Sequence, residues 1–193
     1  MSELFSIQLQ NRQQQGRDGI WLDLPTTTEQ VQAALRQIGI SSDNPHGLFI
    51  SGYFAEEEKR FAIPYNMVLA SNVDELNFLA SRLETLSTGE RAELNAALQV
   101  PQSELFSIGR ITDFPENVEY YVYLPDVRGP AQLGDYYLNR SGMVDMPEEW
   151  KGGIDTAQFG RYVAQQEQGV FTEYGYLVKS GDAWQKVHEG QPV

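Results

Sequence analysis

The spacing of apolar residues changes along this chain of 193 residues, and the change limits the kind of fold that each part can form. In the first third, apolar and polar residues alternate, which is typical of strands with one buried face. From Pro64 onward, apolar residues recur every three to four positions, which is typical of amphipathic helices. The last part mixes both patterns, and each part has apolar faces of its own. We therefore expect an α+β protein of three small domains in series in an elongated chain. The expected domains are residues 1–62 (a small antiparallel sheet with one helix), 63–110 (a helical domain) and 111–193 (a mixed α+β domain).

Strands are expected where residues alternate or where β-branched and aromatic residues accumulate. Two alternating stretches, Leu4–Gln10 and Gly19–Pro25, lie on either side of a polar, glutamine-rich segment. This arrangement predicts a β-hairpin. Four further segments are strand candidates: Leu48–Phe54, Val118–Leu124, Val170–Val178 and Ala183–Val187.

Helix starts are indicated by a capping residue three positions before Glu or Gln. Four pairs have this spacing: Thr26 and Glu29, Asn72 and Glu75, Ser87 and Glu90, and Asp155 and Gln158. Gly39, Pro101 and Gly169 are expected to end the first, third and fourth of these helices. The pair Gly129-Pro130 predicts one more helix, which continues to Leu138.

Acidic residues outnumber basic ones, 27 against 14, which gives a net charge of −13 at pH 7. This balance opposes binding to the phosphates of nucleic acids or of anionic lipids, and it favours basic partners. Residues 111–193 hold 13 of the acids and 6 of the bases, so more than half of the acidic excess lies there. An ordinary acidic surface that keeps the protein soluble is the alternative explanation.

The residues needed for most enzyme classes are missing from the sequence. Without cysteine there is no disulfide, no thiolate zinc site and no cysteine nucleophile. The two histidines, His46 and His188, lack metal-spaced partners, so we expect ordinary surface residues. Neither a nucleophile elbow nor a phosphate-binding loop occurs. Two carboxylates at ~5 to 9 Å could serve glycoside hydrolysis, so a carbohydrate-active enzyme is kept as a distant alternative.

No segment approaches the ~18 consecutive apolar residues of a membrane span. The N-terminal residues Met1–Gln10 have no basic cluster ahead of an apolar run, as a signal peptide would. We therefore expect a cytoplasmic protein that does not contact membranes.

Four motifs of the last part carry a resemblance to a known family. They are Tyr120–Val127, Leu133–Tyr137, Ile154–Arg161 and Phe171–Tyr176, and two earlier motifs, Gly19–Pro25 and Val73–Ala80, extend the likeness over nearly the whole chain. In order and approximate spacing they resemble the ArdA-type antirestriction proteins of mobile genetic elements such as conjugative transposons.

The resemblance implies an elongated, curved homodimer of three-domain chains that imitates bent B-DNA. Such a protein occupies the DNA-binding cleft that the specificity and methylation subunits of a type I restriction-modification enzyme form. The resemblance implies no catalysis, no cofactor, no metal and no direct binding to nucleic acid. An acidic adaptor or regulator of a mobile element, which binds a protein without imitating DNA, is the alternative function.

Most residues of the family motifs are expected to have structural roles. The aromatic residues should lie in the core, two glycines should allow close backbone approach or a turn, and one aspartate should cap a helix. These residues are Trp21, Phe159, Phe171, Tyr174 and Tyr176, then Gly160 and Gly175, and finally Asp155.

The candidate binding residues are carboxylates, since B-DNA presents one charge per ~1.7 Å of its axis. They are expected on the second and third domains. The candidates are Asp74, Glu75, Glu84, Asp113, Glu116, Glu119, Asp126, Asp135, Asp145, Glu148, Glu149, Glu167 and Glu173.

The arrangement of domains in series can be tested by small-angle X-ray scattering on the monomer. A compact chain of this length has a radius of gyration of about 16 Å. Domains in series should give a clearly larger radius. A monomer whose radius lies near about 16 Å would contradict the arrangement.

Overall fold

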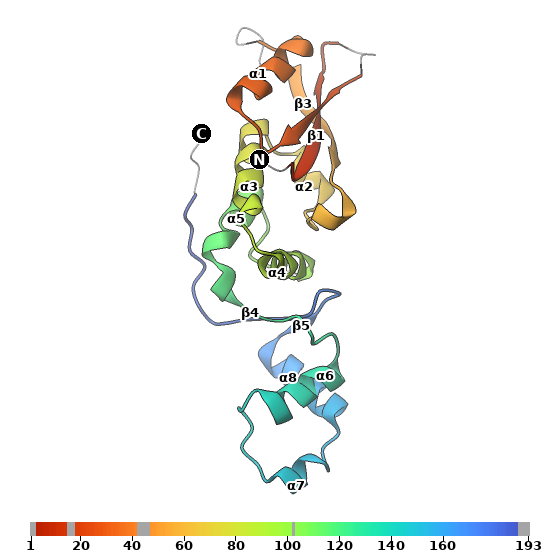
Figure 1. The fold of residues 1–193 in the computed structure, drawn as a ribbon, viewed down its shortest axis with the longest axis vertical. Coiled ribbons are helices and arrows are strands. Elements are labelled where there is room, and N and C mark those ends of the chain that lie inside the picture. The colour runs from red at the N-terminus through yellow and green to blue at the C-terminus, as the bar shows by residue number, and fades with distance from the viewer. Residues whose placement is uncertain (1–2, 15–17, 42–46, 102, 189–193) are drawn as a thin grey trace. The chain divides into compact units, whose positions relative to one another are not determined.

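The computed structural model describes residues 3–14, 18–41, 47–101 and 103–188 (Figure 1). Contacts within the chain define two compact units. Unit 1 comprises Met1–Ser87, Leu105–Pro115 and Lys186–Val193, and unit 2 comprises Thr88–Glu104 and Glu116–Gln185. Helices and strands occur in both units, so the chain belongs to the α+β class, as its sequence predicts. The division into three domains stays a prediction.

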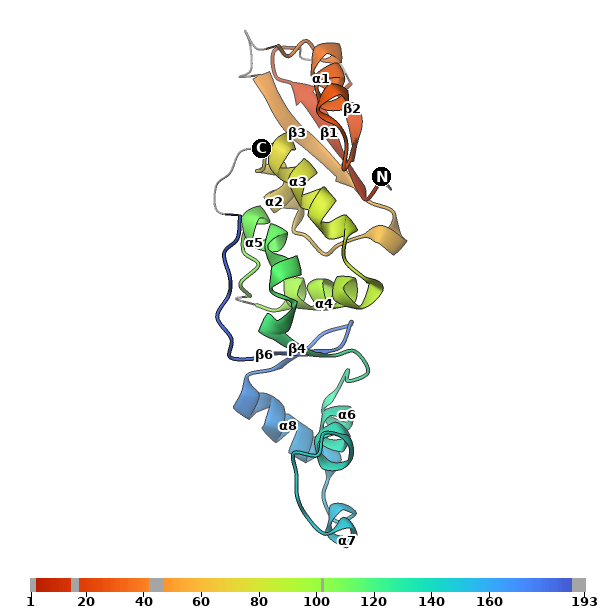
Figure 2. The same cartoon turned by 60° about the vertical axis from the view of Figure 1, so that its left-hand side comes forward.

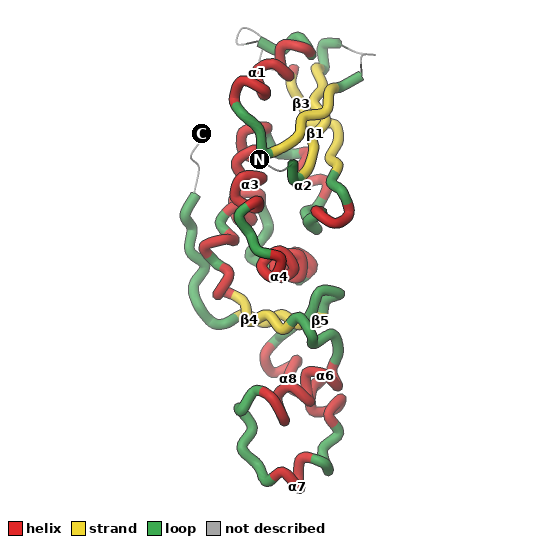
Figure 3. The backbone as a smooth tube through the Cα atoms, viewed as in Figure 1, coloured by secondary structure: helices red, strands yellow, loops and turns green. Residues whose placement is uncertain are grey.

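Unit 1 contains a three-stranded antiparallel sheet, coloured yellow near β1 and β3 in Figure 3. The order of its strands is β2-β1-β3. Its strands are β1 (Phe5–Asn11), β2 (Ile20–Leu24) and β3 (Leu48–Phe54). The expected hairpin and the expected third strand are confirmed. Alternate residues of β1 are buried, because successive side chains of a strand point to opposite faces of the sheet.

The helices of unit 1 pack their apolar faces into its core. They are α1 (Thr28–Gln37), α2 (Tyr65–Leu69), α3 (Val73–Glu84) and α5 (Ile108–Thr112), with a short 3-10 helix, η2 (Glu57–Lys59). Asn72 caps α3 as expected, since its side chain accepts a hydrogen bond from the N–H of Glu75. Asn77 of α3 also exchanges two hydrogen bonds with the backbone of Thr26, at 2.7 and 3.0 Å, and so ties α3 to the segment after β2.

The cap of α1 lies one residue later than its sequence indicates. Thr27 is the N-cap, and it forms the capping box with Gln30, whereas Thr26 and Glu29 were the expected pair. Thr27 has the extended backbone that a cap requires, while the backbone N–H of Thr26 donates a hydrogen bond to the side chain of Asn77. Gly39 ends the helix region as expected, with φ of +72°.

Unit 2 contains a second antiparallel sheet, of order β4-β6-β5. Its strands are β4 (Tyr121–Leu124), β5 (Val170–Phe171) and β6 (Tyr176–Lys179). Its helices are α4 (Thr88–Gln99), α6 (Pro130–Asp135), α7 (Glu148–Lys151) and α8 (Thr156–Glu167). Two shorter helical segments are η4 (Val118–Tyr120) and η5 (Tyr136–Arg140), and η5 is a π-helical continuation of α6. Phe114–Glu116, the 3-10 helix η3, spans the boundary between the units.

Three strand predictions for this part of the chain need correction. Val118–Leu124 begins with η4, so only its second half is a strand. Val170–Val178 is a hairpin rather than one strand, because the hydroxyl of Thr172 accepts the N–H of Gly175 at 3.2 Å and closes a turn. Gly175 has φ of +151°, and a Cβ there would lie 2.6 Å from the carbonyl oxygen of Leu124.

The third correction concerns Ala183–Val187, which forms no strand within the described residues. The backbone N–H and C=O of Gln185 bond instead to the side chain of Asn117, at 2.7 and 2.9 Å. A side-chain amide therefore supplies the partner that a neighbouring strand would have offered. Gln168, with φ of +57°, forms the C-cap of α8, one residue before the expected Gly169.

The core of unit 2 forms around α6, α8 and β6, where Val127, Leu133, Ala164 and Tyr176 are buried together. Phe171 packs against this cluster, with its ring centroid 4.9 Å from that of Tyr176. The expected core position of Tyr176 is confirmed, and Asp155 caps α8 as expected, accepting from the N–H of Gln158. Phe159 and Tyr174 are half-buried.

The core prediction was wrong for Trp21, whose side chain is 51% exposed. Trp21 lies opposite Gln8 in the β1–β2 ladder, on the face of the sheet that carries the polar residues of β1. Its ring extends toward β3, where a Cβ on Gly52 would lie 3.0 Å from the ring. Because successive residues of a strand point to opposite faces of the sheet, the position of Trp21 in β2 places its side chain outside the core.

Helices α6 and α8 lie side by side (Figure 2), and their backbones approach closely at two glycines. A Cβ atom on Gly160 of α8 would overlap the carbonyl oxygen of Pro130. A Cβ on Gly134 of α6 would overlap the carbonyl oxygen of Thr156. The expected role of Gly160 in close backbone approach is confirmed, and Gly134 is its counterpart on the facing helix.

Gly160→Ala should destabilise unit 2 by about 3 kcal/mol, because the methyl group collides with backbone rather than with a movable side chain. Thermal unfolding followed by circular dichroism measures the effect. Gly152→Ala is the matched control, since an added Cβ there meets nothing within 4 Å. Equal stability of the two variants would show that α6 and α8 do not pack through Gly160.

Candidate partner-binding surface

Unit 2 carries the larger share of the acidic excess. It holds 14 acids and 6 bases, a net charge of −8, while unit 1 holds 13 acids and 8 bases, a net charge of −5. Seven of the candidate carboxylates belong to exposed residues of unit 2. They are Glu116, Glu119, Asp126, Asp145, Glu148, Glu149 and Glu173.

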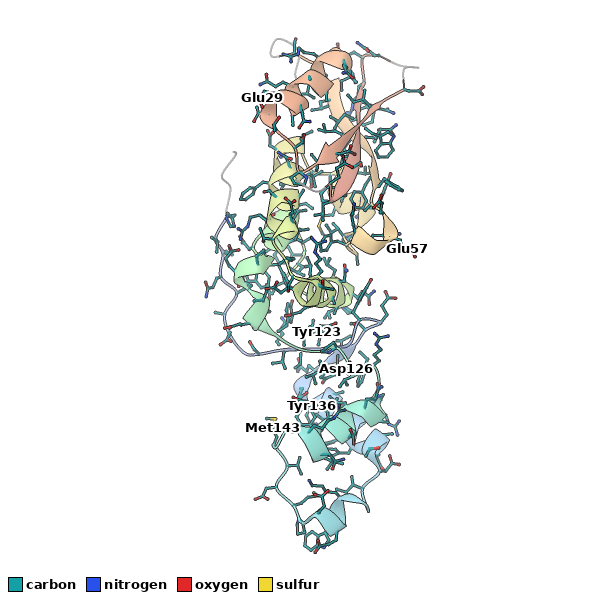
Figure 4. The ribbon with its side chains drawn as sticks, viewed as in Figure 1. Glu29, Glu57, Tyr123, Asp126, Tyr136 and Met143 are labelled. Carbon is teal, nitrogen blue, oxygen red and sulfur yellow. The ribbon has the colours of Figure 1, made fainter. Side chains whose placement is uncertain are left out.

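These exposed acids come from several elements, so the fold distributes them over the unit. Glu116 and Glu119 lie on the 3-10 turns before β4, and Asp126 follows the end of β4 (Figure 4). Glu173 occupies the turn between β5 and β6, which lies against the chain at Leu124 and Pro125 because Gly175 approaches both. Asp126 and Glu173 are therefore on neighbouring segments.

Ion pairs with basic side chains reduce the local negative charge of unit 2. Arg140 pairs with Asp135 at 3.1 Å, Lys151 with Glu148 at 2.9 Å, and Lys179 with Glu104 at 3.5 Å. Exposed pairs of this kind contribute at most about 1 kcal/mol. Asp135 and Glu148 already share their charge with a base, so they are weaker candidates for contact with a partner.

The side chain of Glu167 has a structural role within unit 2. The hydroxyl groups of Tyr137 and Tyr176 donate to its two carboxylate oxygens, the second at 2.9 Å. Burial, followed by this hydrogen bonding to Glu167, raises the pKa of both tyrosines above their usual range. The carboxylate of Glu167 thus joins the end of α8 to η5 and β6, and it is not offered to a partner.

Asp113, in unit 1, also lies in the interior, with 3% of its surface exposed. One carboxylate oxygen accepts the backbone N–H of His188 at 3.0 Å and lies 2.8 Å from its Nδ1. The His188 ring meets Phe78 edge to face, with centroids 5.1 Å apart. His188 is therefore half-buried with a specific role rather than an ordinary surface residue, and Asp113 is a poor candidate for phosphate mimicry. His46 lies outside the described residues.

The remaining candidates lie on α3 of unit 1. Asp74 is exposed and Glu75 half-buried in the first turn, where carboxylates favour the positive end of the helix dipole. Glu84 is half-buried in the last turn. A role in helix stability is sufficient to explain the first two positions.

Glu93 of α4 is a carboxylate with unusual properties that sequence reasoning missed. Its Oε1 is buried and has no hydrogen-bond partner among the described residues. Burial, and then the nearby Glu90 carboxylate, raises its pKa to about 7. A signal was present, since Glu93 precedes the fully buried Ala97 by one helical turn.

No group of His, Cys, Asp and Glu suited to hold a metal occurs in the part of the chain that the structure describes. No described helix is long and apolar enough to cross a membrane. The described part of unit 2 is an α+β scaffold with a net negative charge and several exposed carboxylates.

A comparison with known families identifies the scaffold. The family model described as "Antirestriction protein (ArdA)" matches residues 15–178. The chain therefore belongs to the ArdA family of antirestriction proteins. No curated protein matches the chain.

The titration of Glu93 predicts a pH dependence of stability. Because its pKa is raised from 4.5 to about 7, the folded state binds this proton more tightly than the unfolded state. The contribution of Glu93 to the free energy of unfolding is therefore largest below about pH 4.5 and is lost as the pH rises through about 7. Glu93→Gln should stabilise the protein above that pH by about 1 kcal/mol, a value reduced for the exposed part of the group.

Urea unfolding at about pH 5.5 and at about pH 8 measures this effect. Glu149→Gln is the control, because it removes an equal charge from an exposed position in α7. If Glu93→Gln and Glu149→Gln changed stability equally at both pH values, the carboxyl group of Glu93 would not be the titrating group.

Proposed function

We propose that this ArdA-family protein inhibits a type I restriction-modification enzyme by placing its carboxylates where DNA phosphates bind. The target is the DNA-binding cleft of the specificity and methylation subunits. The observation that carries the proposal is the set of seven exposed candidate acids on unit 2, within a unit of net charge −8. The family match supports an antirestriction role for the same chain.

The proposed mechanism needs no catalytic group in this chain. A cleft that binds DNA is lined with Lys and Arg, and its affinity for phosphates depends on the release of counterions. Exposed carboxylates present the same negative charge to the same Lys and Arg side chains, so they compete with DNA. The enzyme does not modify or cleave them. Free DNA is repelled by the net charge of −13, and direct binding to nucleic acid is not expected.

Exposure and hydrogen bonding support a smaller set of contact residues for the proposal. The proposed contacts of unit 2 are Glu116, Glu119, Asp126, Asp145, Glu149 and Glu173. Asp135 and Glu148 are weaker candidates because each forms an ion pair. Further contacts are proposed from unit 1, at Asp74, Glu75 and Glu84. Asp113 and Glu167 are left out because their carboxylates hold the fold together. We further propose that the active form is a homodimer in the cytoplasm, where the target enzyme meets DNA.

Purified protein should inhibit the binding of DNA by a purified type I methylation complex. Added salt should weaken the inhibition, because charge pairing is screened and counterion release is reduced. A mobility-shift competition assay over a series of salt concentrations measures both properties. The protein alone, mixed with the same duplex, is the control. Lack of inhibition with several type I enzymes would favour the adaptor alternative.

The binding energy should be distributed over many carboxylates. Each of Glu116→Gln, Glu119→Gln, Asp126→Asn and Glu149→Gln should lower the affinity about fivefold or less. Together they should lower it by two to three orders of magnitude and flatten its salt dependence. Glu29→Gln and Glu57→Gln, which remove charge from exposed positions of unit 1 outside the candidate set, should have much smaller effects. A single carboxylate that abolished inhibition by itself would contradict this mechanism.

A further inference from the structure

The loop between η5 and α8, residues 141–155, exposes two large apolar side chains. Met143 is 74% exposed and Trp150 is 65% exposed, and both belong to unit 2 (Figure 4 labels Met143). Trp is a residue that is highly buried on average, and it is enriched among the few residues that contribute most to binding at protein interfaces. We call residues 141–155 the anchor loop.

Local hydrogen bonds hold Trp150 in its exposed position. The N–H of Trp150 donates to the carbonyl of Pro147, and the carbonyl of Trp150 accepts the N–H of Gly153, both at 3.0 Å. The next side chain, Lys151, is only 18% exposed and pairs with Glu148 at 2.9 Å. Because consecutive helical residues point in different directions, the inward Lys151 leaves Trp150 directed to solvent.

The anchor loop does not use Trp150 to fill its own interior. A hollow of about 440 Å³ lies beside α7, lined by Leu138, Asn139, Glu148, Lys151, Ile154 and Thr156. Apolar and polar groups both face this space, and the ring of Trp150 is not part of its lining. The loop therefore presents a projecting aromatic side chain next to an open hollow.

The surroundings of the two apolar side chains are acidic. Asp145, Glu148 and Glu149 lie between Met143 and Trp150 in the chain and are exposed. Residues 141–155 hold four acids and one base, and that base is the Lys151 of the ion pair. The complementary partner surface is consequently basic and contains an apolar pocket large enough for an aromatic side chain.

We propose that the anchor loop docks into the basic cleft of the methylation subunit, with Trp150 entering an apolar pocket and Met143 packing at its edge. Enzymes that methylate DNA bases extrude the target base into a pocket lined with aromatic and apolar side chains, so a basic DNA cleft of this kind contains a suitable site. Asp145 and Glu149 form ion pairs with Lys and Arg side chains at the rim of this pocket, as the phosphates flanking an extruded nucleotide do. The inference rests on the proposed function, and it adds a contact that salt does not screen.

The experiment compares Trp150→Ala, Trp150→Phe and Met143→Ala with wild-type protein in the competition assay with a type I methylation complex. Trp150→Ala should lower the affinity roughly thirtyfold at every salt concentration and leave the salt dependence unchanged, because an apolar anchor is lost and no charge is removed. Trp150→Phe should retain most of the affinity. Met143→Ala should have a smaller effect, roughly threefold to tenfold.

Trp21→Ala is the matched control, because Trp21 is also about half exposed but lies on the sheet of unit 1. It should leave the affinity unchanged. Circular dichroism and the melting temperature should be the same for Trp150→Ala and wild type, since an exposed side chain contributes little to folding.

The possible outcomes separate this inference from the proposed function. Salt-dependent inhibition by wild type together with full affinity of Trp150→Ala would overturn the anchor loop and keep the DNA mimicry. Absence of inhibition by wild type would overturn both. If sedimentation showed that Trp150→Ala dissociates an oligomer of wild type, the loop would contact a second copy of this chain, and the inference would be wrong.

Discussion

The close backbone contact between α6 and α8 is the constraint on which the architecture of unit 2 depends. Gly134 and Gly160 allow the two helices to approach at backbone distance, and no other residue type fits there. Glu167, at the end of α8, then bonds to Tyr137 of η5 and to Tyr176 of β6. The helix pair and the sheet are thereby joined, and both ends of the anchor loop are fixed. A loop held at both ends can present Trp150 to a partner at a lower cost in conformational entropy than a free segment.

The carboxylates of this acidic chain occupy three physically different environments. Asp113 and Glu167 accept hydrogen bonds from specific donors and stabilise the fold. Glu93 is buried with an oxygen that lacks a donor, so its proton is retained to higher pH. Exposed acids such as Asp126 and Glu149 remain in contact with solvent. Only these exposed carboxylates can exchange contacts with water for contacts with the basic side chains of a partner without disturbing the core.

The proposed binding mode combines two kinds of free energy. Distributed carboxylates give long-range attraction and fast association, but solvent and salt reduce the contribution of each. A buried aromatic anchor contributes through removal of apolar surface from water, which salt leaves largely intact. An inhibitor that competes with DNA over a long charged cleft gains residence time from such an anchor, because most differences in affinity come from the rate of dissociation.

The sequence by itself determined the features that depend on neighbours in the chain. Alternation predicted the β1–β2 hairpin, helical spacing and Asn72 predicted α3, and the family motifs predicted the ArdA family. Local patterns could not say which carboxylates find donors far along the chain, as Asp113 does with His188, 75 residues away. Nor could they predict that the side chains of Trp21 and Trp150 are exposed to solvent, because exposure depends on which elements cover a face. Tertiary structure decided these points, since burial and hydrogen-bond partners are properties of contacts between distant segments.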